Sequence, residues 1–224
     1  MKLLIVRHGE TDWNVDGRLQ GQTDIELNDK GREMARQTGI GMKDVHIDLC
    51  YSSPLKRAYE TAELMLAGRD IEIRTDDRLK EASFGKWEGL ICKAEGYNVP
   101  LKSFSTYWLN PESPEIDESV ERLPQLAIRV EDFFRDLVSD ESLKDKTILI
   151  TLHGCVLRAI LYLIEGKKPF AELKGSVPFN CEVLECDAAM ENGELIMKDM
   201  GRSVYYDDSL KFNYYATMAM AKTK

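Results

Sequence analysis

The sequence predicts an α/β fold, a three-layer sandwich with a mostly parallel central sheet flanked by helices. Two observations support this: short continuous apolar runs recur along the chain, and segments with apolar residues at helical spacing separate them. Continuous apolar runs indicate strands buried on both faces, and strands that alternate with helices build parallel sheets. The length of 224 residues fits one domain, which we expect to span residues 1–224 with an inserted lid segment at about 90–118.

The first half of the chain alternates between predicted strands and helices. Residues 3–6 (Leu-Leu-Ile-Val) read as a buried strand, and residues 71–73 alternate as a short strand does. Asn28 is the expected N-cap of the first helix. Ser53 followed by Pro54 marks the start of the second helix, because a capping serine before proline is a typical helix beginning. The residues at helical spacing are Leu27, Met34, Ala35 and Thr38 in the first helix and Leu55, Ala58, Ala62 and Met65 in the second.

The second half begins with a segment of different composition. Residues 90–118 contain three prolines and many polar residues, and their aromatic residues follow no strict period, so we interpret this segment as an insertion or lid rather than core. A long helix follows, because apolar residues from Leu123 to Leu137 keep a 3.6-residue period, with Pro124 in the first turn. The remaining expected elements are a buried strand at 147–152, a helix at 156–164, and strands at 181–186 and 194–198.

The charge balance and cysteine content exclude several classes of function. With 30 basic and 39 acidic residues the formal net charge is −9, which disfavours binding to nucleic acid or to anionic membranes. No apolar run approaches the ~18 residues of a membrane span, and the apolar run at the N-terminus is too short for a signal peptide. Five cysteines without a CxxC pair indicate reduced thiols, so we expect a cytoplasmic protein. No metal-ligand spacing is present, and we expect no metal.

Two of the three histidines follow predicted buried strands directly. His8 comes after the strand at 3–6, and His153 comes after the strand at 147–152. Ligands of open α/β sheets bind outside the carboxyl ends of the strands, so we expect these two side chains to share one site. The third histidine, His46, is expected to be structural or exposed.

Cations near these histidines favour an anionic ligand. Arg7 precedes His8 and supplies a fixed positive charge beside a nucleophile or base, and Gly9 allows the backbone to approach a ligand closely. Arg57 falls in the first turn of its predicted helix, where the helix dipole disfavours a cation unless an anion lies nearby.

A series of motifs carries a closer resemblance. The segments are Arg7-His8-Gly9-Glu10-Thr11-Asp12-Trp13-Asn14, Gly17-Arg18-Leu19-Gln20-Gly21, Leu27-Asn28-Asp29-Lys30-Gly31, Ser52-Ser53-Pro54-Leu55-Lys56-Arg57-Ala58, Glu81-Ala82-Ser83-Phe84-Gly85-Lys86-Trp87-Glu88-Gly89 and Leu152-His153-Gly154. In this order and spacing they resemble the histidine phosphatase superfamily, in its phosphoglycerate-mutase-like branch. The resemblance runs from residue 2 to about residue 89 and again from about 119 to 187.

The resemblance implies that His8 is the nucleophile and becomes a phosphohistidine, and we expect no cofactor. It implies that Glu81 protonates the leaving oxygen and then activates water, although Glu10 and Glu88 are rival acids by sequence alone. Cations suit this chemistry because charge spreads over the phosphoryl oxygens during transfer, and the two arginines should also keep the nucleophile neutral. The residues implied to hold the phosphate are Arg7, Asn14, Gln20, Gly21, Arg57 and His153.

The choice between hydrolysis and transfer depends on residues 90–118. Glycolytic mutases of this family carry an insertion rich in basic residues after the catalytic glutamate, whereas this segment has two lysines against five acidic residues. We therefore expect a phosphatase acting on a small phosphomonoester, with a mutase or a non-catalytic phosphate-binding module as alternatives. The aromatic residues Tyr97, Phe104, Tyr107 and Trp108 either line a pocket for an apolar leaving group or pack on one another. Residues 205–224 either pack on their own domain or mediate a homodimer.

Overall fold

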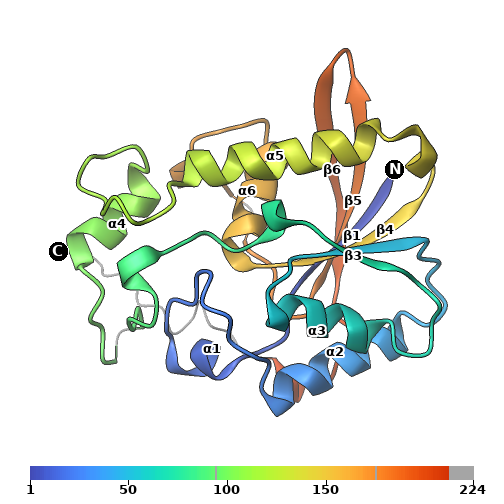
Figure 1. Ribbon diagram of the computed structural model, residues 1–224, viewed down its shortest axis with the longest axis horizontal. Coiled ribbons are helices and arrows are strands. Elements are labelled where there is room, and N and C mark those ends of the chain that lie inside the picture. The colour runs from blue at the N-terminus through green and yellow to red at the C-terminus, as the bar shows by residue number, and fades with distance from the viewer. Residues whose placement is uncertain (94, 175, 212–224) are drawn as a thin grey trace.

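A six-stranded sheet lies between two layers of helices in the computed structural model, which describes residues 1–93, 95–174 and 176–211 (Figure 1). The strand order is β3-β2-β4-β1-β5-β6. The first four strands are parallel to one another, while β5 and β6 form an antiparallel hairpin at one edge. The predicted three-layer α/β fold is confirmed. The strands are β1 (Lys2–Arg7), β2 (Leu49–Ser52), β3 (Ile73–Thr75), β4 (Thr147–Leu152), β5 (Val183–Glu191) and β6 (Glu194–Ser203).

The helices divide between the two faces of the sheet, as Figure 1 shows, with α2 and α3 on one face and α5 and α6 on the other. The short helices α1 and α4 lie beyond the end of the sheet. The helices are α1 (Asp12–Asp16), α2 (Asp29–Gly41), α3 (Lys56–Met65), α4 (Leu101–Leu109), α5 (Leu123–Ser139) and α6 (Gly154–Ile164). Single 3-10 turns occur at Asp77–Leu79, Gly85–Trp87, Glu141–Leu143, Phe170–Glu172 and Asp208–Leu210.

The central strand β1 contributes to the hydrophobic clusters on both faces. Leu3 and Ile5 belong to the cluster beneath α5 and α6, whereas Leu4 and Val6 belong to the cluster beneath α2 and α3. Successive side chains of a strand point to opposite faces, so a strand covered on both sides needs apolar residues at every position. The continuous apolar run therefore follows from the three-layer arrangement.

One of the two predicted helix starts is confirmed and the other is wrong. The Asn28 side chain accepts a hydrogen bond from the Gly31 amide (2.8 Å) and caps α2. Ser53 does not cap α3, which begins at Lys56 after the N-cap Leu55. Its hydroxyl accepts a bond from the Leu55 amide (3.3 Å), before the helix begins, and lies 2.8 Å from the ring of His153, which follows β4. Ser53 thus combines a local bond with a long-range polar contact, and the helix begins later than predicted.

Other element boundaries shift by a few residues. Strand β3 begins at Ile73, where the predicted strand 71–73 ends. Strands β5 and β6 both extend beyond the predicted 181–186 and 194–198, because they pair with each other along a long hairpin. The sequence does not predict α1, since five residues are too few to show a helical period.

The segment at 90–118 is wrongly predicted to stand apart from the core. Tyr107, on α4, is completely buried, and Val99 and Ile116 join the same hydrophobic cluster as α5 and α6. The ring of Tyr107 packs edge-on against Trp87, with 6.1 Å between centroids. The apolar face of α4 thus extends the core beyond the end of the sheet. The role of this segment as a lid stays a prediction.

The beginning of the segment 205–224 packs on its own domain. Tyr206 is buried in the cluster beneath α2 and α3, and its hydroxyl donates a hydrogen bond to the backbone oxygen of Asn180 (2.8 Å). Residues 212–224 lie outside the described part of the chain, so the homodimer remains an untested alternative. Within the described part, no helix combines the length and apolar character needed to cross a membrane.

Replacing Tyr107 with alanine should test whether α4 belongs to the core. We expect Tyr107→Ala to lower the free energy of unfolding by about 3–5 kcal/mol, because a fully buried aromatic side chain leaves a cavity. Leu109→Ala, on the same helix but 71% exposed, should change it by less than about 0.5 kcal/mol. Urea unfolding measures both values. Equal small effects would mean that α4 is an independent lid.

Candidate active site

The candidate site lies at the carboxyl ends of adjacent parallel strands. Strands β1 and β4 pair in a register that sets Arg7 opposite Leu152, so the residues that follow them, His8 and His153, emerge together. The centroids of the two imidazole rings are 5.2 Å apart. The prediction that these histidines share one location is confirmed, and the parallel register is its cause.

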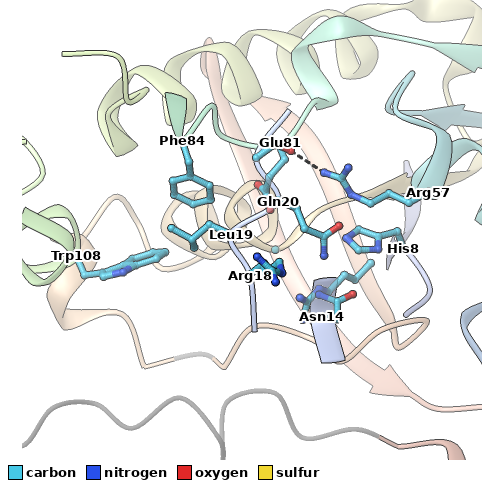
Figure 2. Close-up of a pocket in the computed structure, with 12 residues that line it drawn as sticks. His8, Asn14, Arg18, Leu19, Gln20, Arg57, Glu81, Phe84 and Trp108 are labelled. Carbon is cyan, nitrogen blue, oxygen red and sulfur yellow. Dashed lines mark hydrogen bonds between the residues drawn. The ribbon is translucent and has the colours of Figure 1, made fainter. Parts of the chain in front are cut away.

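A pocket opens beside His8, and Figure 2 shows how its lining residues are arranged. Arg57, His8 and Asn14 gather at one end, whereas Phe84, Leu19 and Trp108 lie at the other, with Glu81 and Gln20 between them. The pocket encloses about 90 Å³, well below the ~300–1,000 Å³ of sites for drug-sized ligands. It therefore suits a small substrate. The lining residues are Arg7, His8, Asn14, Arg18, Leu19, Gln20, Gly21, Arg57, Glu81, Phe84, Trp108 and Gly154.

The ring of His8 is held in one orientation. Its backbone amide donates to the oxygen of Leu152 (2.9 Å), and its backbone oxygen accepts from the side-chain amide of Asn180 (2.7 Å). The ring Nδ1 lies 2.7 Å from the backbone oxygen of Gly9. A carbonyl oxygen only accepts hydrogen bonds, so this contact assigns the proton to Nδ1 and the lone pair to Nε2. A neutral His8 would thus carry its nucleophilic nitrogen on the other side of the ring.

Burial keeps both histidines neutral. The pKa of His8 is well below its usual value, first because the ring is buried and then because Arg57 and Arg7 lie nearby. The pKa of His153 is also lowered, again mainly by burial and then by the charge of Arg57. From the sequence we expect only the two arginines to keep His8 neutral. Burial of the ring away from water lowers its pKa more than the arginines do, and burial cannot be read from the sequence.

His153 lies behind the pocket wall. It is completely buried, and its Nε2 is 2.8 Å from the hydroxyl of Ser53 at the end of β2. It contacts His8 but is not among the residues that line the pocket. Its predicted contact with a phosphoryl oxygen stays a prediction.

Arg57 faces the pocket from the first turn of α3. Its two terminal nitrogens donate to the backbone oxygens of Thr23 (2.9 Å) and Gly21 (2.7 Å). Burial lowers the pKa of Arg57 to about 10, which leaves the guanidinium charged at neutral pH. Glu81 and other nearby carboxylates act in the opposite direction. The helix dipole disfavours a cation in the first turn of α3, and the two backbone carbonyls and the nearby carboxylates offset this effect for Arg57.

The loop that holds Arg57 is anchored by Glu88. The carboxylate of Glu88 accepts bonds from the backbone amides of Gln22 (3.0 Å), Thr23 (2.9 Å) and Phe84 (3.1 Å). Gly21 has a φ of +54°, and a Cβ there would overlap the Glu88 side chain. The glycine is therefore required by both its backbone angle and its neighbour. Glu88 does not line the pocket.

Among the described residues, Glu81 is the carboxylate that lines the pocket. It accepts bonds from the backbone amide of Cys155 at the start of α6 (3.0 and 3.1 Å) and from the amide of Ala82 (2.9 Å). The rival acid Glu10 is buried elsewhere, with Asn28 and Lys30 against its carboxylate. The structure thus separates three carboxylates that are equivalent by sequence.

The remaining predicted contacts also line the pocket. The oxygen of the Asn14 amide accepts bonds from the backbone and hydroxyl of Thr11 (3.1 and 3.2 Å), so its NH₂ group is the part that can bind an anion. Gln20 is 8% exposed and lines the pocket beside Gly21. Within the described part of the chain, no group of three or more His, Cys, Asp or Glu side chains could hold a metal ion.

Sequence reasoning misplaces Gly9 and misses several lining residues. A Cβ at Gly9 would lie 2.5 Å from the backbone oxygen of Gly31, so this glycine permits close packing against α2 rather than against a ligand. Trp108 lines the pocket, whereas Tyr107 does not. The residues that sequence reasoning misses are Arg18, Leu19, Phe84 and Gly154 in the wall and Ser53, Thr61 and Asn180 behind it. All but Thr61 and Asn180 lie within the motifs that carry the family resemblance, and no local pattern distinguishes those two.

Known proteins share the sequence and the fold of this chain. The model of the histidine phosphatase superfamily (branch 1) matches residues 3–197. The chain is 34% identical over 165 residues to the uncharacterized phosphatase PhoE of Bacillus subtilis, covering 74% of this chain and 78% of that protein. It is 31% identical over 170 residues to a 2,3-bisphosphoglycerate-dependent phosphoglycerate mutase of Cytophaga hutchinsonii, covering 75% and 78%. A phosphoserine phosphatase from Entamoeba histolytica, solved with phosphoserine, has a TM-score of 0.72 and 25% identity over 90% of this chain and 95% of its own.

The two neutral histidines should make stability depend on pH. Both have a lower pKa in the folded chain than the ordinary 6.5, so below that pH the unfolded chain binds more protons. Their contribution to stability is complete above about pH 6.5 and is lost as the pH falls, by up to about 1.4 kcal/mol per pH unit for each histidine. Urea unfolding between about pH 5.5 and about pH 7.5 measures this, and His153→Gln should show a shallower loss than the wild type. Identical slopes would contradict the assignment.

Proposed function

This chain belongs to branch 1 of the histidine phosphatase superfamily, and we propose that it hydrolyses phosphomonoesters through a phosphohistidine on His8. The observation that supports this most directly is the orientation of His8. Its Nδ1 is engaged by Gly9, which leaves Nε2 as the nucleophilic atom of a neutral ring next to a pocket lined by Arg7 and Arg57. A fixed, unprotonated nucleophile beside buried cations is the arrangement that phosphoryl transfer requires.

In the first step, Nε2 of His8 attacks the phosphorus atom. A P–N bond forms as the bond to the leaving oxygen breaks, and Glu81 donates a proton to that oxygen. Arg7 and Arg57 stabilise the charge that spreads over the phosphoryl oxygens, with Asn14 as a further donor. The ring becomes cationic when Nε2 is phosphorylated, and the Gly9 carbonyl that accepts from Nδ1 favours that form.

In the second step, water attacks the phosphohistidine. The carboxylate of Glu81 accepts a proton from the water as the P–N bond breaks, so inorganic phosphate leaves and the neutral ring is restored. Glu81 returns to its protonated form for the next cycle. The same arginines hold the phosphoryl group in both steps, and splitting the displacement in two lowers each barrier.

The cations that a second acidic group of the substrate could use are already paired, which favours hydrolysis over a mutase reaction. Lys102 pairs with Glu115 (2.6 Å), and Lys93 lies against the backbone oxygen of Val15 (3.3 Å), so neither lines the pocket. Arg18 does line it, but this arginine pairs with Asp16 (3.1 Å). A bisphosphate or phosphoglycerate substrate would place further negative charge there with little to bind it. A mutase reaction remains the second candidate because several relatives are phosphoglycerate mutases.

The apolar end of the pocket suggests the class of leaving group. Leu19, Phe84 and Trp108 form this end, opposite the arginines (Figure 2). Aromatic and aliphatic walls favour a leaving group with an apolar or aromatic part. Of the four aromatic residues for which the sequence leaves open a place in a pocket or packing on one another, Trp108 lines the pocket.

The proposed hydrolysis should proceed in excess EDTA and be blocked by orthovanadate. We expect the wild type to release phosphate from p-nitrophenyl phosphate under these conditions, because arginines supply the charge stabilisation. His8→Ala should lose turnover by at least about 10³-fold while unfolding at the same urea concentration as the wild type. Retained activity in that variant would remove His8 as the nucleophile.

The mutase alternative makes the opposite prediction. Isomerisation of 3-phosphoglycerate faster than hydrolysis of simple esters would replace the phosphatase assignment. Absence of both reactions, with phosphate still binding to the wild type, would indicate a phosphate-binding module.

Trp108 should affect the leaving group and not the phosphate. We expect Trp108→Ala to raise KM for phenyl phosphate by roughly three- to tenfold, from the loss of about 0.5–1.5 kcal/mol of aromatic contact. Inhibition by inorganic phosphate should not change. The neighbouring exposed Leu109→Ala serves as the control. A matching change in phosphate inhibition would contradict the division of the pocket into two ends.

A further inference from the structure

We propose that the ion pair of Arg129 and Glu121 positions Glu81 for catalysis by fixing the backbone of residues 78–83. The inference rests on the proposed function, since it concerns the acid of that reaction. Neither residue lines the pocket, so each acts through Glu81 rather than on the substrate.

The pair has the geometry of a two-point interaction. From α5, the Nε and one terminal nitrogen of Arg129 donate to the two carboxylate oxygens of Glu121 (2.6 and 2.9 Å). The side chains are 21% and 17% exposed, so solvent screens them less than surface pairs. A guanidinium bound in this way has a fixed plane, and its remaining N–H groups point in fixed directions.

Those remaining groups bind the segment that carries Glu81. Arg129 donates to the backbone oxygens of Arg78 (2.6 Å) and Glu81 (3.1 Å). Glu121 accepts from the amide of Ser83 through its side chain (3.1 Å) and donates to the oxygen of Ser83 through its backbone (2.8 Å). The pair therefore contacts the segment before, at and after the proposed acid.

The segment has little regular structure to hold it otherwise. Residues 78 and 79 end one single 3-10 turn, and residues 80–83 lie between it and the next, outside any strand or long helix. The side chain of Gln22 also donates to the Glu81 backbone oxygen (3.1 Å). A rotation of this peptide would move the carboxylate away from the Cys155 amide at the start of α6. Misplacement of a catalytic group by about 1 Å can reduce the rate by ~10²-fold.

A second arginine on the same helix provides a matched comparison. Arg135 pairs with Glu131 (2.9 Å) and donates to the backbone oxygen of Gly193 (3.1 Å). It thus combines a carboxylate and a carbonyl partner as Arg129 does, but it contacts the β5–β6 hairpin and not the segment of Glu81. Loss of Arg135 should affect stability without affecting the chemistry.

Two esters with different leaving groups can show whether Arg129 positions Glu81 or only stabilises the fold. p-Nitrophenolate departs readily without a proton, whereas the alcohol of benzyl phosphate must be protonated as it leaves, so a misplaced acid affects the second ester far more. We expect Arg129→Met to lower kcat/KM for benzyl phosphate at least about tenfold, with little change for p-nitrophenyl phosphate. Glu81→Gln should show the same pattern with a larger loss, and Arg135→Met should show none. Arg129→Lys should not restore activity, because one ammonium cannot make this set of bonds.

Amide hydrogen exchange tests the same inference without an activity assay. The Cys155 and Ser83 amides, bonded to Glu81 and Glu121, should exchange faster in Arg129→Met than in the wild type and in Arg135→Met. Unchanged exchange at both amides, or equal losses on both esters, would overturn the inference. If the wild type hydrolyses neither ester, the proposed function fails and the exchange result still decides the positioning. Glu121→Gln replaces Arg129→Met if the latter does not fold.

Discussion

The parallel pairing of β1 with β4 is the constraint on which the rest of the molecule depends. Their register sets Arg7 opposite Leu152, and the histidines that follow are then brought within 5.2 Å without any direct bond between them. Apolar side chains cover both faces of these strands, so a slip by one residue would exchange the two buried faces and break the backbone ladder. The position of His8 is thus fixed by the core and not by the loop that contains it.

The same burial that orders the site also determines its charge. Loss of water holds His8 neutral, and it strengthens the attraction of Arg57 for any anion that enters. Arg57 spends two donors on the carbonyls of Gly21 and Thr23, so it is oriented before a ligand binds. Keeping cations and a neutral imidazole in one buried place costs stability in the empty protein. Preorganised charge of this kind is a general source of catalytic power.

The role of a residue could be predicted from the sequence where its partner is close in the chain, and not where the partner is distant. Apolar runs identify β1 and β4, and the Asn28 cap is identified correctly because its partner is three residues away. Ser53 is a residue type that caps helices and Gly9 is one that allows a close approach to a ligand. In the structure Ser53 contacts His153 and Gly9 packs against Gly31, and both partners are distant in the chain. The buried face of α4 escapes sequence reasoning for the same reason, since prolines and polar residues obscure its period. Choosing Glu81 among 39 acidic residues needs either a family resemblance or a structure.

The two ends of the pocket come from different parts of the chain, and this bears on how such a protein can diversify. The end that we propose for the phosphate is built from residues that follow β1 and from α3, which the core holds in place. Trp108 at the other end belongs to a helix that joins the core only by its inner face. Replacement of that wall can alter which esters are accepted while the reacting groups stay undisturbed. Leu19 and Phe84 are exceptions, because Leu19 adjoins Gln20 and Phe84 lies three residues from Glu81, so their substitution would change selectivity and chemistry together.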